Sequence, residues 1–466
     1  MSDYKDPVLE QMKSVAPNID EEREWIIKSR AKGKGALLKT FVRLSGPGWL
    51  QSAITLGGGS LSSSMYLGVL VGFGLLWLQP LAMIAGIIML SAIAYVTLST
   101  GRRPVRTINE YVNPVLGWSW LLASMLANLV WSMPQYSLAI ASFQQNLFPQ
   151  IFGPPMLEPF TGKVIACIII FGINLSFLIM YTIGGRGVKF FEIIVKLMVA
   201  SIVICFFSVV VVLTITGQVR WQDYLAGFIP DFSLLFRPSK DLMPFIQQVP
   251  EQFRSYWTQL IVSQQRDVII SATATAVGIN MTFMLPYSML RKGWNREFRG
   301  LAIFDLSTGL FFPFVIATSC VIIASAAQFH AKPAPGFLGE RDEQGNIIQP
   351  APNLVSSFQK LMEGRIIYEI GEQAWNLLSN SEKEQKINSL PETDRKLSAM
   401  MVRRDAFNLS DALKPLTGST LAKYIFGIGV LGMGLSASTM LMLINSLCFC
   451  ELLNRPLRGW TQFIGG

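Results

Sequence analysis

Leu56-Gly57-Gly58-Gly59-Ser60 interrupts an apolar stretch that is otherwise long enough to cross a membrane. A glycine inside a helix costs about 1 kcal/mol relative to alanine, so a regular helix is not expected to continue through three in succession. Irregular backbone at membrane depth is tolerated only where it lines a cavity or is buried in protein. We therefore expect a broken membrane helix whose interruption contributes to a central site.

A second interruption is predicted much later in the chain, at Met284-Leu285-Pro286-Tyr287-Ser288. Two interrupted hydrophobic segments in corresponding positions of two halves are the best sequence indication of the binding site of a transporter. The two interruptions are therefore expected to face each other across one cavity near the middle of the bilayer.

The composition is that of a membrane protein, because 51% of the residues are hydrophobic, 15% are charged and the mean hydropathy is +0.41. A soluble domain contains about 25% charged residues. Apolar windows of about 20 residues, the length needed to cross the hydrocarbon core, recur along the chain. The predicted fold class is thus all-α and polytopic, with eight spans at 46–70, 73–99, 117–147, 163–182, 187–216, 270–290, 300–328 and 421–450.

Basic residues follow every second span, and the intervening short loops contain almost none. This alternation predicts that both ends of the chain lie in the cytoplasm and that the protein is an integral, multi-pass protein of the plasma (inner) membrane. The lipid bilayer is the expected partner. The net charge of +9 is spread over separate loops, a distribution that argues against binding to nucleic acid.

We expect four regions along the chain. Residues 1–43 form a polar cytoplasmic segment, 44–330 the first seven spans, 331–419 an extracytoplasmic cap, and 420–466 the eighth span with a cytoplasmic end. Two long loops are predicted, at 217–268 and within the cap, where Ser381 and Glu384 form a capping-box pattern. The only histidine, His330, is expected at the surface.

The cysteines and the histidine give no sign of catalysis or of a structural metal site. All five cysteines fall within predicted spans, and no CxxC pair occurs. Buried cysteine usually acts as a small hydrophobic side chain. We find no arrangement of nucleophile, base or metal ligands, so we expect neither an enzyme nor a bound cofactor.

Several segments, taken in order, resemble the Nramp family of proton-coupled divalent metal transporters. Gly46-Pro47-Gly48 opens the first span, Leu56–Ser60 stands where the family has Asp-Pro-Gly-Asn, and Leu285-Pro286-Tyr287 stands in for its Met-Pro-His. The resemblance implies a LeuT-type fold of two inverted five-helix repeats with helices 1 and 6 broken. In that pattern helices 9 and 10 would follow 455–466, so the sequence is expected to be a fragment.

The resemblance also identifies the candidate substrate-binding residues and shows how they differ from the family pattern. Its carboxylate, amide, carbonyl-bearing alanine, thioether and imidazole positions are occupied here by Gly57, Ser60, Thr282, Leu285 and Tyr287, and Asn280 is a further polar neighbour. A divalent ion prefers anionic oxygen or, when soft, sulfur. No bound metal is therefore expected at this site, although a shift of register could bring the thioether of Met281 or Met284 to it.

Three charged residues fall within the predicted spans. Glu192 and Lys196 are four residues apart in the fifth span, and Asp305 lies in the seventh. Ionisable groups inside a membrane are functional candidates by default. We interpret these three as gating or structural ion pairs near the cytoplasmic ends of the spans.

Three hypotheses of function remain open from the sequence. The first is an Nramp-related secondary transporter whose diverged site no longer carries Mn²⁺ or Fe²⁺ and instead takes hydrated Mg²⁺ or a small organic or anionic solute. The second is a receptor or scaffold that uses the 331–419 region and does not transport. The third is retained transport of a divalent metal, Mg²⁺ among others, through neutral ligands. Mg²⁺ keeps several of its waters when bound, so hydroxyl groups could hold the hydrated ion.

Overall fold

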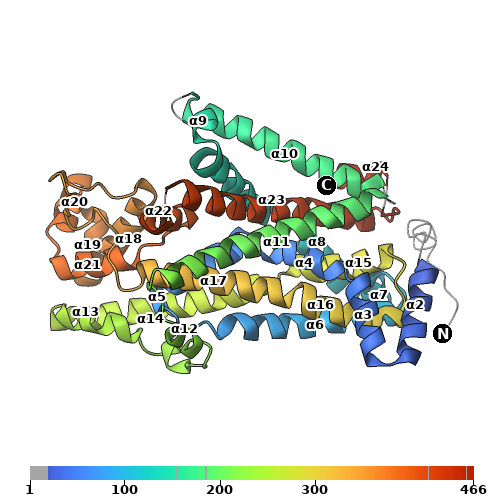
Figure 1. The fold of residues 1–466 in the computed structure, drawn as a ribbon. Coiled ribbons are helices and arrows are strands. Elements are labelled where there is room, and N and C mark those ends of the chain that lie inside the picture. Colours follow the sequence, from blue (N-terminus) through green and yellow to red (C-terminus); the bar gives the residue numbers. More distant parts are fainter. Residues whose placement is uncertain (1–18, 154–155, 184–185, 418, 458) are drawn as a thin grey trace.

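The fold is a long bundle of membrane helices with a helical cap at one end and a small helical hairpin at the other (Figure 1). The computed structural model describes residues 19–466 apart from 154–155, 184–185, 418 and 458. The helices of the bundle are α4 (Pro47–Thr55), α5 (Gly58–Val71), α6 (Leu78–Thr100), α8 (Pro114–Ala141), α10 (Pro159–Ile183), α11 (Arg186–Ile215), α14 (Glu251–Ala276), α15 (Ile279–Arg291), α16 (Arg299–Gly309), α17 (Phe311–Phe329) and α23 (Ser419–Leu452).

These helices confirm the predicted class of fold. Within the described residues, seven helical stretches are long and apolar enough to cross a membrane, and the bent pair α4–α5 makes an eighth. They overlap the eight spans predicted from the sequence. The first span is broken where the glycine run predicts, because α4 and α5 meet at an angle of 55°.

The position predicted for the second break is wrong. Helix α14 ends at Ala276 and α15 begins at Ile279, so the break lies at Val277 and Gly278, while Pro286 lies inside α15. Val277 and Gly278 are both extended. Proline removes one backbone donor and often kinks a helix, but neighbouring helices can satisfy the freed groups and let the helix continue.

The loop predicted at 217–268 is also shorter than expected, since α14 already begins at Glu251. The part of α14 before residue 269 carries charged and polar residues, including Glu251, Arg254 and Arg266, so it contains no long apolar window. The beginning of α14 packs against the cap, through Phe253 and Trp257. The connection before it contains α12 (Trp221–Ala226), η2 (Phe232–Leu235), η3 (Lys240–Leu242) and α13 (Met243–Gln248).

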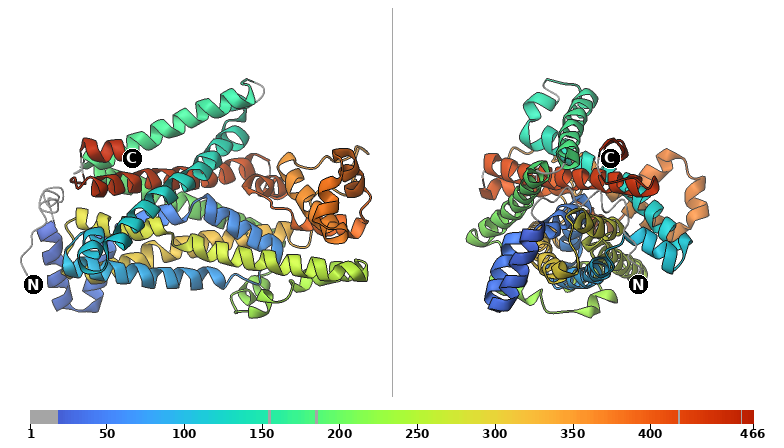
Figure 2. Two further views of the ribbon diagram at one scale, coloured as in Figure 1. Left: turned by 180° about the vertical axis from the view of Figure 1, so that it is seen from behind. Right: turned by 90° about the vertical axis from the view of Figure 1, so that its right-hand side faces the viewer.

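The remaining short helices lie at the two ends of the bundle (Figures 1 and 2). At the end near the N-terminus are α2 (Ile19–Lys32), α3 (Lys34–Leu44), α7 (Pro104–Tyr111), η4 (Arg296–Phe298) and α24 (Trp460–Gly465). At the opposite end, α8 continues into η1 (Ser142–Leu147) and α9 (Pro149–Phe152), and the cap consists of α18 (Pro352–Ile370), α19 (Glu372–Leu377), α20 (Asn380–Asn388), α21 (Glu392–Met401) and α22 (Ala406–Thr417).

The most buried span is α23, which runs through the bundle, whereas α8 and α10 lie at its side (Figure 2). In the apolar window that marks each span, 78% of the residues of α23 are buried, but only 22% of those of α8 and 28% of those of α10. Exposed apolar side chains on a membrane helix face lipid. The window of the α16–α17 stretch is 72% buried, and most residues of α5 are buried as well. The core of the bundle is therefore formed by α23, α17 and α5, and α8 and α10 form part of its lipid-facing rim.

A buried ion pair between two helices of the cap, Arg365 of α18 and Asp394 of α21, also contacts the beginning of α14. Asp394 Oδ1 accepts hydrogen bonds from Trp257 Nε1 at 2.6 Å and from Arg365 Nε at 3.2 Å. Both charged side chains are almost completely buried, and the Arg365 guanidinium stacks on Phe253 at 3.1 Å from the ring centre. Removing one partner from such a pair is strongly destabilising, so the cap is a fixed part of the fold.

Two smaller predictions in this region are corrected. The capping box uses Ser379 and Glu382 instead of Ser381 and Glu384, because the helix begins at Asn380. The side chain of His330 is only 9% exposed. Its Nδ1 lies 2.9 Å from the carbonyl of Val69, and its Nε2 lies 3.1 Å from Asp241, so it joins the end of α5 to η3. The hydrogen bond from His330 lowers the pKa of Asp241.

Candidate functional site

The break in the first span is shaped by packing against α8. Gly57 has φ −118° and ψ −173°, an extended conformation that any residue adopts. Space is the constraint instead, since a Cβ atom at this position would lie 3.0 Å from Oε1 of Gln135 and 3.1 Å from the Cβ of Ala437. A larger residue at this position would therefore have to displace the side chain of Gln135 or Ala437 by a few tenths of an ångström.

That side chain belongs to Gln135 of α8, which the sequence analysis did not identify. It is only 3% exposed, and its Oε1 accepts a hydrogen bond from the backbone N–H of Gly58 at 2.8 Å. The amide therefore caps the N-terminus of α5, where a helix offers free N–H groups and partial positive charge. The only signal in the sequence is a glutamine directly after Pro134 in an apolar span.

The two broken spans meet directly. The hydroxyl of Thr55, the last residue of α4, lies 3.2 Å from the carbonyl of Ala276, the last residue of α14, and 3.1 Å from the sulfur of Met281. A second contact joins the hydroxyls of Ser63 and Thr275 at 3.3 Å. The last carbonyls of a helix lack partners within the helix, so the hydroxyl of Thr55 satisfies a group that the second break sets free.

The predicted site residues are distributed over a longer region than one pocket. Ser60 stays at the first break, where its hydroxyl donates to the Gly57 carbonyl at 2.9 Å. Asn280 is buried beside the second break, and its Oδ1 accepts from the N–H of Met281 at 2.9 Å. Leu285 is buried further along α15.

The side chains of Thr282 and Tyr287 contact aromatic residues and not the first break. Thr282 accepts a hydrogen bond from Trp120 Nε1 at 3.2 Å. Trp120 precedes Gln135 by fifteen residues on α8, or about 22 Å along the helix axis. Tyr287 is completely buried and stacks on Phe283, with ring centres 4.5 Å apart. The structure therefore groups Gly57 and Ser60 with Gln135, and it places Thr282 and Tyr287 toward the end of α8 that bears α7.

A second glutamine adjoins the break. Gln51 of α4 is completely buried, and neither atom of its amide has a hydrogen-bond partner within the described structure. A buried amide without partners costs about 1–3 kcal/mol, so it is retained more readily where water or a ligand can bind it. Gln51 lies one helical turn before Thr55 and thus adds an unsatisfied neutral polar group near the two breaks.

Asp305 holds the beginning of the first span in place. Its carboxylate accepts hydrogen bonds from the Ser45 hydroxyl, from the N–H of Gly46 at 3.0 Å and from the N–H of Gly48 at 2.6 Å. These groups surround the start of α4, where Gly48 packs so closely that a Cβ would meet the Asp305 carbonyl at 2.2 Å. Asp305 is therefore an N-terminal cap supplied by another helix.

The pairing suggested by the spacing of Glu192 and Lys196 is wrong. Glu192 pairs with Lys292, at 2.8 Å, and Lys196 donates to the Ser45 carbonyl at 2.9 Å. Each side chain is directed to a neighbouring element, so the four-residue spacing on α11 does not decide the partner. Both contacts surround the beginning of α4, where they add to the anchor formed by Asp305.

A further buried ion pair was not identified from the sequence. Arg103 and Glu451 are 2.9 Å apart, with side chains 1% and 2% exposed. Arg103 also donates to Asn454 at 3.0 Å, so it joins the start of α7 to the end of α23. Arg103 was counted only as a loop charge, and nothing in the sequence indicated its partner.

The polar groups around the two breaks that could bind a substrate are neutral. They are hydroxyls, amides, carbonyls and one thioether, and in the described part of the chain no three His, Cys, Asp or Glu side chains come together in a metal-binding arrangement. Two broken spans that meet within a helical bundle, with the first anchored at its start, define a transporter of the LeuT type.

Comparisons with known proteins identify the family. The profile described as "Natural resistance-associated macrophage protein-like" (Nramp) matches residues 48–339. This chain belongs to the Nramp family, as its sequence motifs indicated, and the members of that family are membrane transporters. No curated protein sequence matches the chain significantly.

Solved structures with a similar fold include a manganese transporter of Eremococcus coleocola. Its complex with an aromatic bis-isothiourea substituted compound is 14% identical, with a TM-score of 0.50 over 90% of this chain and 80% of that one. A mutant of the same transporter is 16% identical, with a TM-score of 0.49 over 90% and 72% of the two chains. At such low identity the likeness supports the LeuT-type fold alone.

Proposed function

We propose that this chain is a secondary transporter with a neutral central site that does not carry Mn²⁺ or Fe²⁺. The observation that carries the proposal is the position of Gln135. Its uncharged amide fills the space beside Gly57 and binds the N–H of Gly58. The family resemblance places a carboxylate at the position that Gly57 occupies here.

The charge of a bound metal ion must be compensated by its ligands. A divalent ion that leaves water for a low-dielectric site loses its hydration energy, and anionic ligands are the usual compensation. At the two breaks the chain offers the hydroxyls of Thr55 and Ser60, backbone carbonyls, and the amides of Gln51 and Gln135. Such groups suit a substrate that is uncharged or that keeps its own water shell.

Retained transport of a divalent metal is the second candidate, and one contact favours it. The sulfur of Met281 lies 3.1 Å from the hydroxyl of Thr55, which in turn lies 3.2 Å from the carbonyl of Ala276. A thioether, a hydroxyl and a carbonyl thus converge without a carboxylate. Sulfur suits a soft transition metal, whereas the oxygen atoms alone would suit hydrated Mg²⁺.

Isothermal titration of the purified protein tests the proposal. We expect Mn²⁺ and Fe²⁺ to give no saturable isotherm below the millimolar range, because no anionic ligand offsets their desolvation. The same titration with Mg²⁺ distinguishes a hydrated ion from an uncharged solute. Met281→Leu is the matched variant, since it removes the sulfur and keeps a similar apolar volume. A micromolar one-to-one Mn²⁺ isotherm that Met281→Leu abolishes would replace the proposal with the second candidate.

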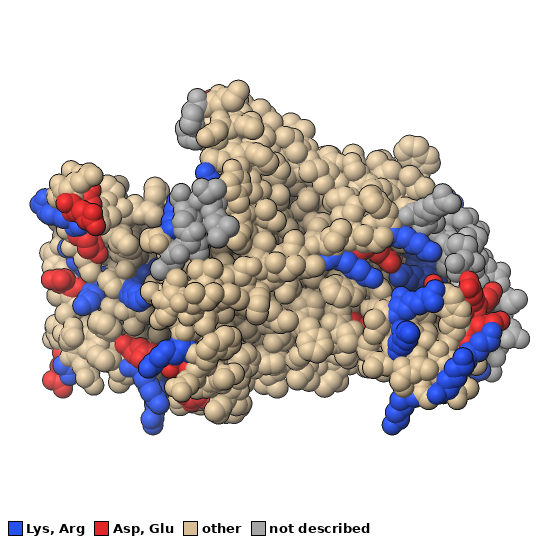
Figure 3. All heavy atoms as spheres, viewed as in Figure 1, with Lys and Arg blue, Asp and Glu red and all other residues tan. Residues whose placement is uncertain are grey.

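We also propose that the end carrying α2, α3 and α7 faces the cytoplasm. Lys and Arg side chains gather at this end and at the cap, with an uncharged belt between them (Figure 3). The regular alternation of basic loops supports this orientation. In intact cells a membrane-impermeant maleimide should label Lys383→Cys in the cap and leave Lys34→Cys in α3 unlabelled. The reverse pattern would invert the topology.

A further inference from the structure

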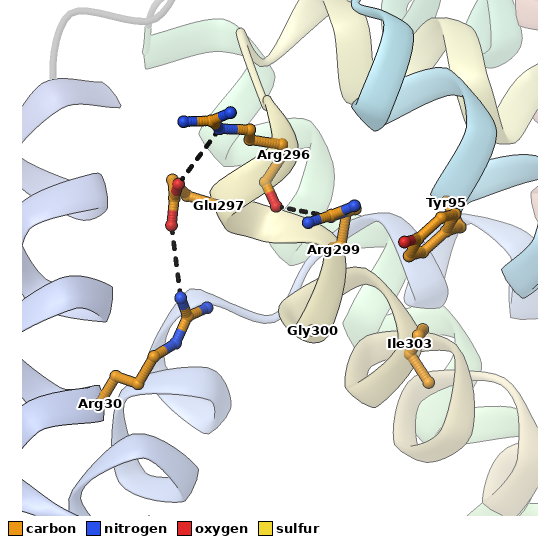
Figure 4. Close-up of a pocket in the computed structure, with 7 residues that line it drawn as sticks. All are labelled: Arg30, Tyr95, Arg296, Glu297, Arg299, Gly300 and Ile303. Carbon is orange, nitrogen blue, oxygen red and sulfur yellow. Dashed lines mark hydrogen bonds and ion pairs between the residues drawn. The ribbon is translucent and has the colours of Figure 1, made fainter.

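A basic cavity lies beside the membrane belt at the end of the molecule that carries α2. It has a volume of about 440 Å³ and is lined by residues from α2, α6, η4 and α16, namely Arg30, Tyr95, Arg296, Glu297, Arg299, Gly300 and Ile303. Three arginines against one glutamate leave an excess of two positive charges. Figure 4 shows Arg30 and Arg296 on either side of Glu297, with Arg299 directed toward Tyr95.

Arg299 is held in place by neutral groups. Its Nε donates to the Arg296 carbonyl at 3.0 Å, one terminal nitrogen donates to the Ser99 hydroxyl at 3.1 Å, and the guanidinium lies 4.6 Å from the centre of the Tyr95 ring. Among the described residues it forms no ion pair. Its charge is therefore oriented in advance and still available to an anion.

The single carboxylate of the cavity is shared. Glu297 lies 3.4 Å from Arg30 and 3.5 Å from Arg296, and both arginine side chains are more than half exposed. Ion pairs with such exposure contribute little to stability, because water screens the attraction and the long side chains lose freedom on pairing. An incoming anion can therefore engage Arg30 and Arg296 without first breaking a strong interaction.

The cavity adjoins apolar surface that faces lipid. Ile303, which lines it, is 41% exposed, and Tyr95 is 52% exposed. From Tyr95 an exposed stripe continues along α6 through Ile88, Ile84 and Leu81 at helical spacing. Tyrosine is enriched where a membrane helix reaches the head groups. A molecule bound here would have its charged group among arginines and its apolar part along α6.

We propose that this cavity binds the phosphate of an anionic phospholipid, with the acyl chains lying along the exposed stripe of α6. Arginine binds phosphate through paired N–H donors, and basic pockets between membrane helices bind anionic head groups. The lipid would join Arg30 of α2 to Arg299 of α16 and so attach the N-terminal hairpin to the bundle. Free phosphate has the same anionic oxygen atoms as the head group, but it has no apolar part that could pack on the exposed stripe of α6.

Native mass spectrometry of the purified protein with added lipid tests this site. We expect phosphatidylglycerol to be retained in preference to phosphatidylcholine, with one tightly bound molecule. Arg299→Gln and Arg30→Gln should each weaken retention at least about tenfold, the effect of losing a charge-assisted hydrogen bond. Arg43→Gln is the matched control, because it removes the same charge from a residue of α3 that stacks on Trp25 outside the cavity.

Thermal unfolding in lipid-free detergent shows whether the variants keep the fold, and Arg299→Lys provides a conservative variant that retains charge and should recover part of the binding. In a separate experiment inorganic phosphate replaces lipid. Stabilisation by millimolar phosphate without retention of lipid would overturn the assignment to a phospholipid. Equal retention of the two lipids, or equal losses in Arg43→Gln and Arg299→Gln, would overturn the site itself.

Discussion

Combining Gly57→Asp, Ser60→Asn and Leu285→Met with Gln135→Ala is expected to produce Mn²⁺ binding in the micromolar range, whereas we expect the unchanged protein to show none below the millimolar range. The first three changes restore a carboxylate, an amide and a thioether, which are ligands for a divalent transition metal. The fourth makes room, because a Cβ at position 57 would lie 3.0 Å from the Gln135 amide. Isothermal titration with Mn²⁺ measures the gain.

The control is the triple variant that keeps Gln135. Its new carboxylate would be forced against the amide, and overpacking of this kind costs about 1–3 kcal/mol. We expect this variant to unfold at a lower temperature and to bind Mn²⁺ weakly. If the fourfold variant folds normally and still shows no Mn²⁺ isotherm, the backbone around the breaks differs from that of a metal site.

Asp305→Ala is expected to destabilise the protein by roughly 3–5 kcal/mol, because it removes the acceptor of three hydrogen bonds at the start of α4. The N–H groups of Gly46 and Gly48 would remain buried without partners. Asp305→Asn retains one acceptor oxygen and should recover part of the loss. Thermal unfolding in detergent, followed by tryptophan fluorescence, measures these differences.

Ser307→Ala is the matched control for Asp305. It lies on the same helix, α16, and its exposed hydroxyl bonds only to the carbonyl of Ile303, at 2.8 Å. Its effect should stay within about 0.5 kcal/mol, as for most surface substitutions. If Asp305→Ala is as mild as this control, then the carboxylate is not the anchor of the first span.

Membrane spans could be predicted from the sequence because their signal is local. An apolar window of sufficient length forms a helix in lipid whatever its neighbours are, since each of its backbone hydrogen bonds closes within the segment. The run Gly57–Gly59 was equally reliable, because three glycines weaken a helix by themselves. The start of α14 was missed for the same reason, since a half-helix packed on a polar cap carries no apolar window.

The second break shows where local signals are insufficient. Gly278 and Pro286 both weaken a helix, and the sequence alone does not rank them. In the fold, the carbonyl freed at Ala276 meets the hydroxyl of Thr55, while α15 continues through Pro286. The break forms where the freed backbone groups find partners on another helix.

The sequence by itself determined the membrane class, the approximate positions of the spans, the family and the break at the run Gly57–Gly59. Tertiary structure alone decided that Gln135 lies beside Gly57, and which partners Glu192, Asp305 and Arg103 acquired. A buried polar group must be satisfied by whichever neighbour lies within about 3 Å, and that neighbour can be hundreds of residues away along the chain. Composition and spacing do not reveal such contacts, so only the packed helices show that Gln135 of α8 fills the space beside Gly57 and binds the N–H of Gly58.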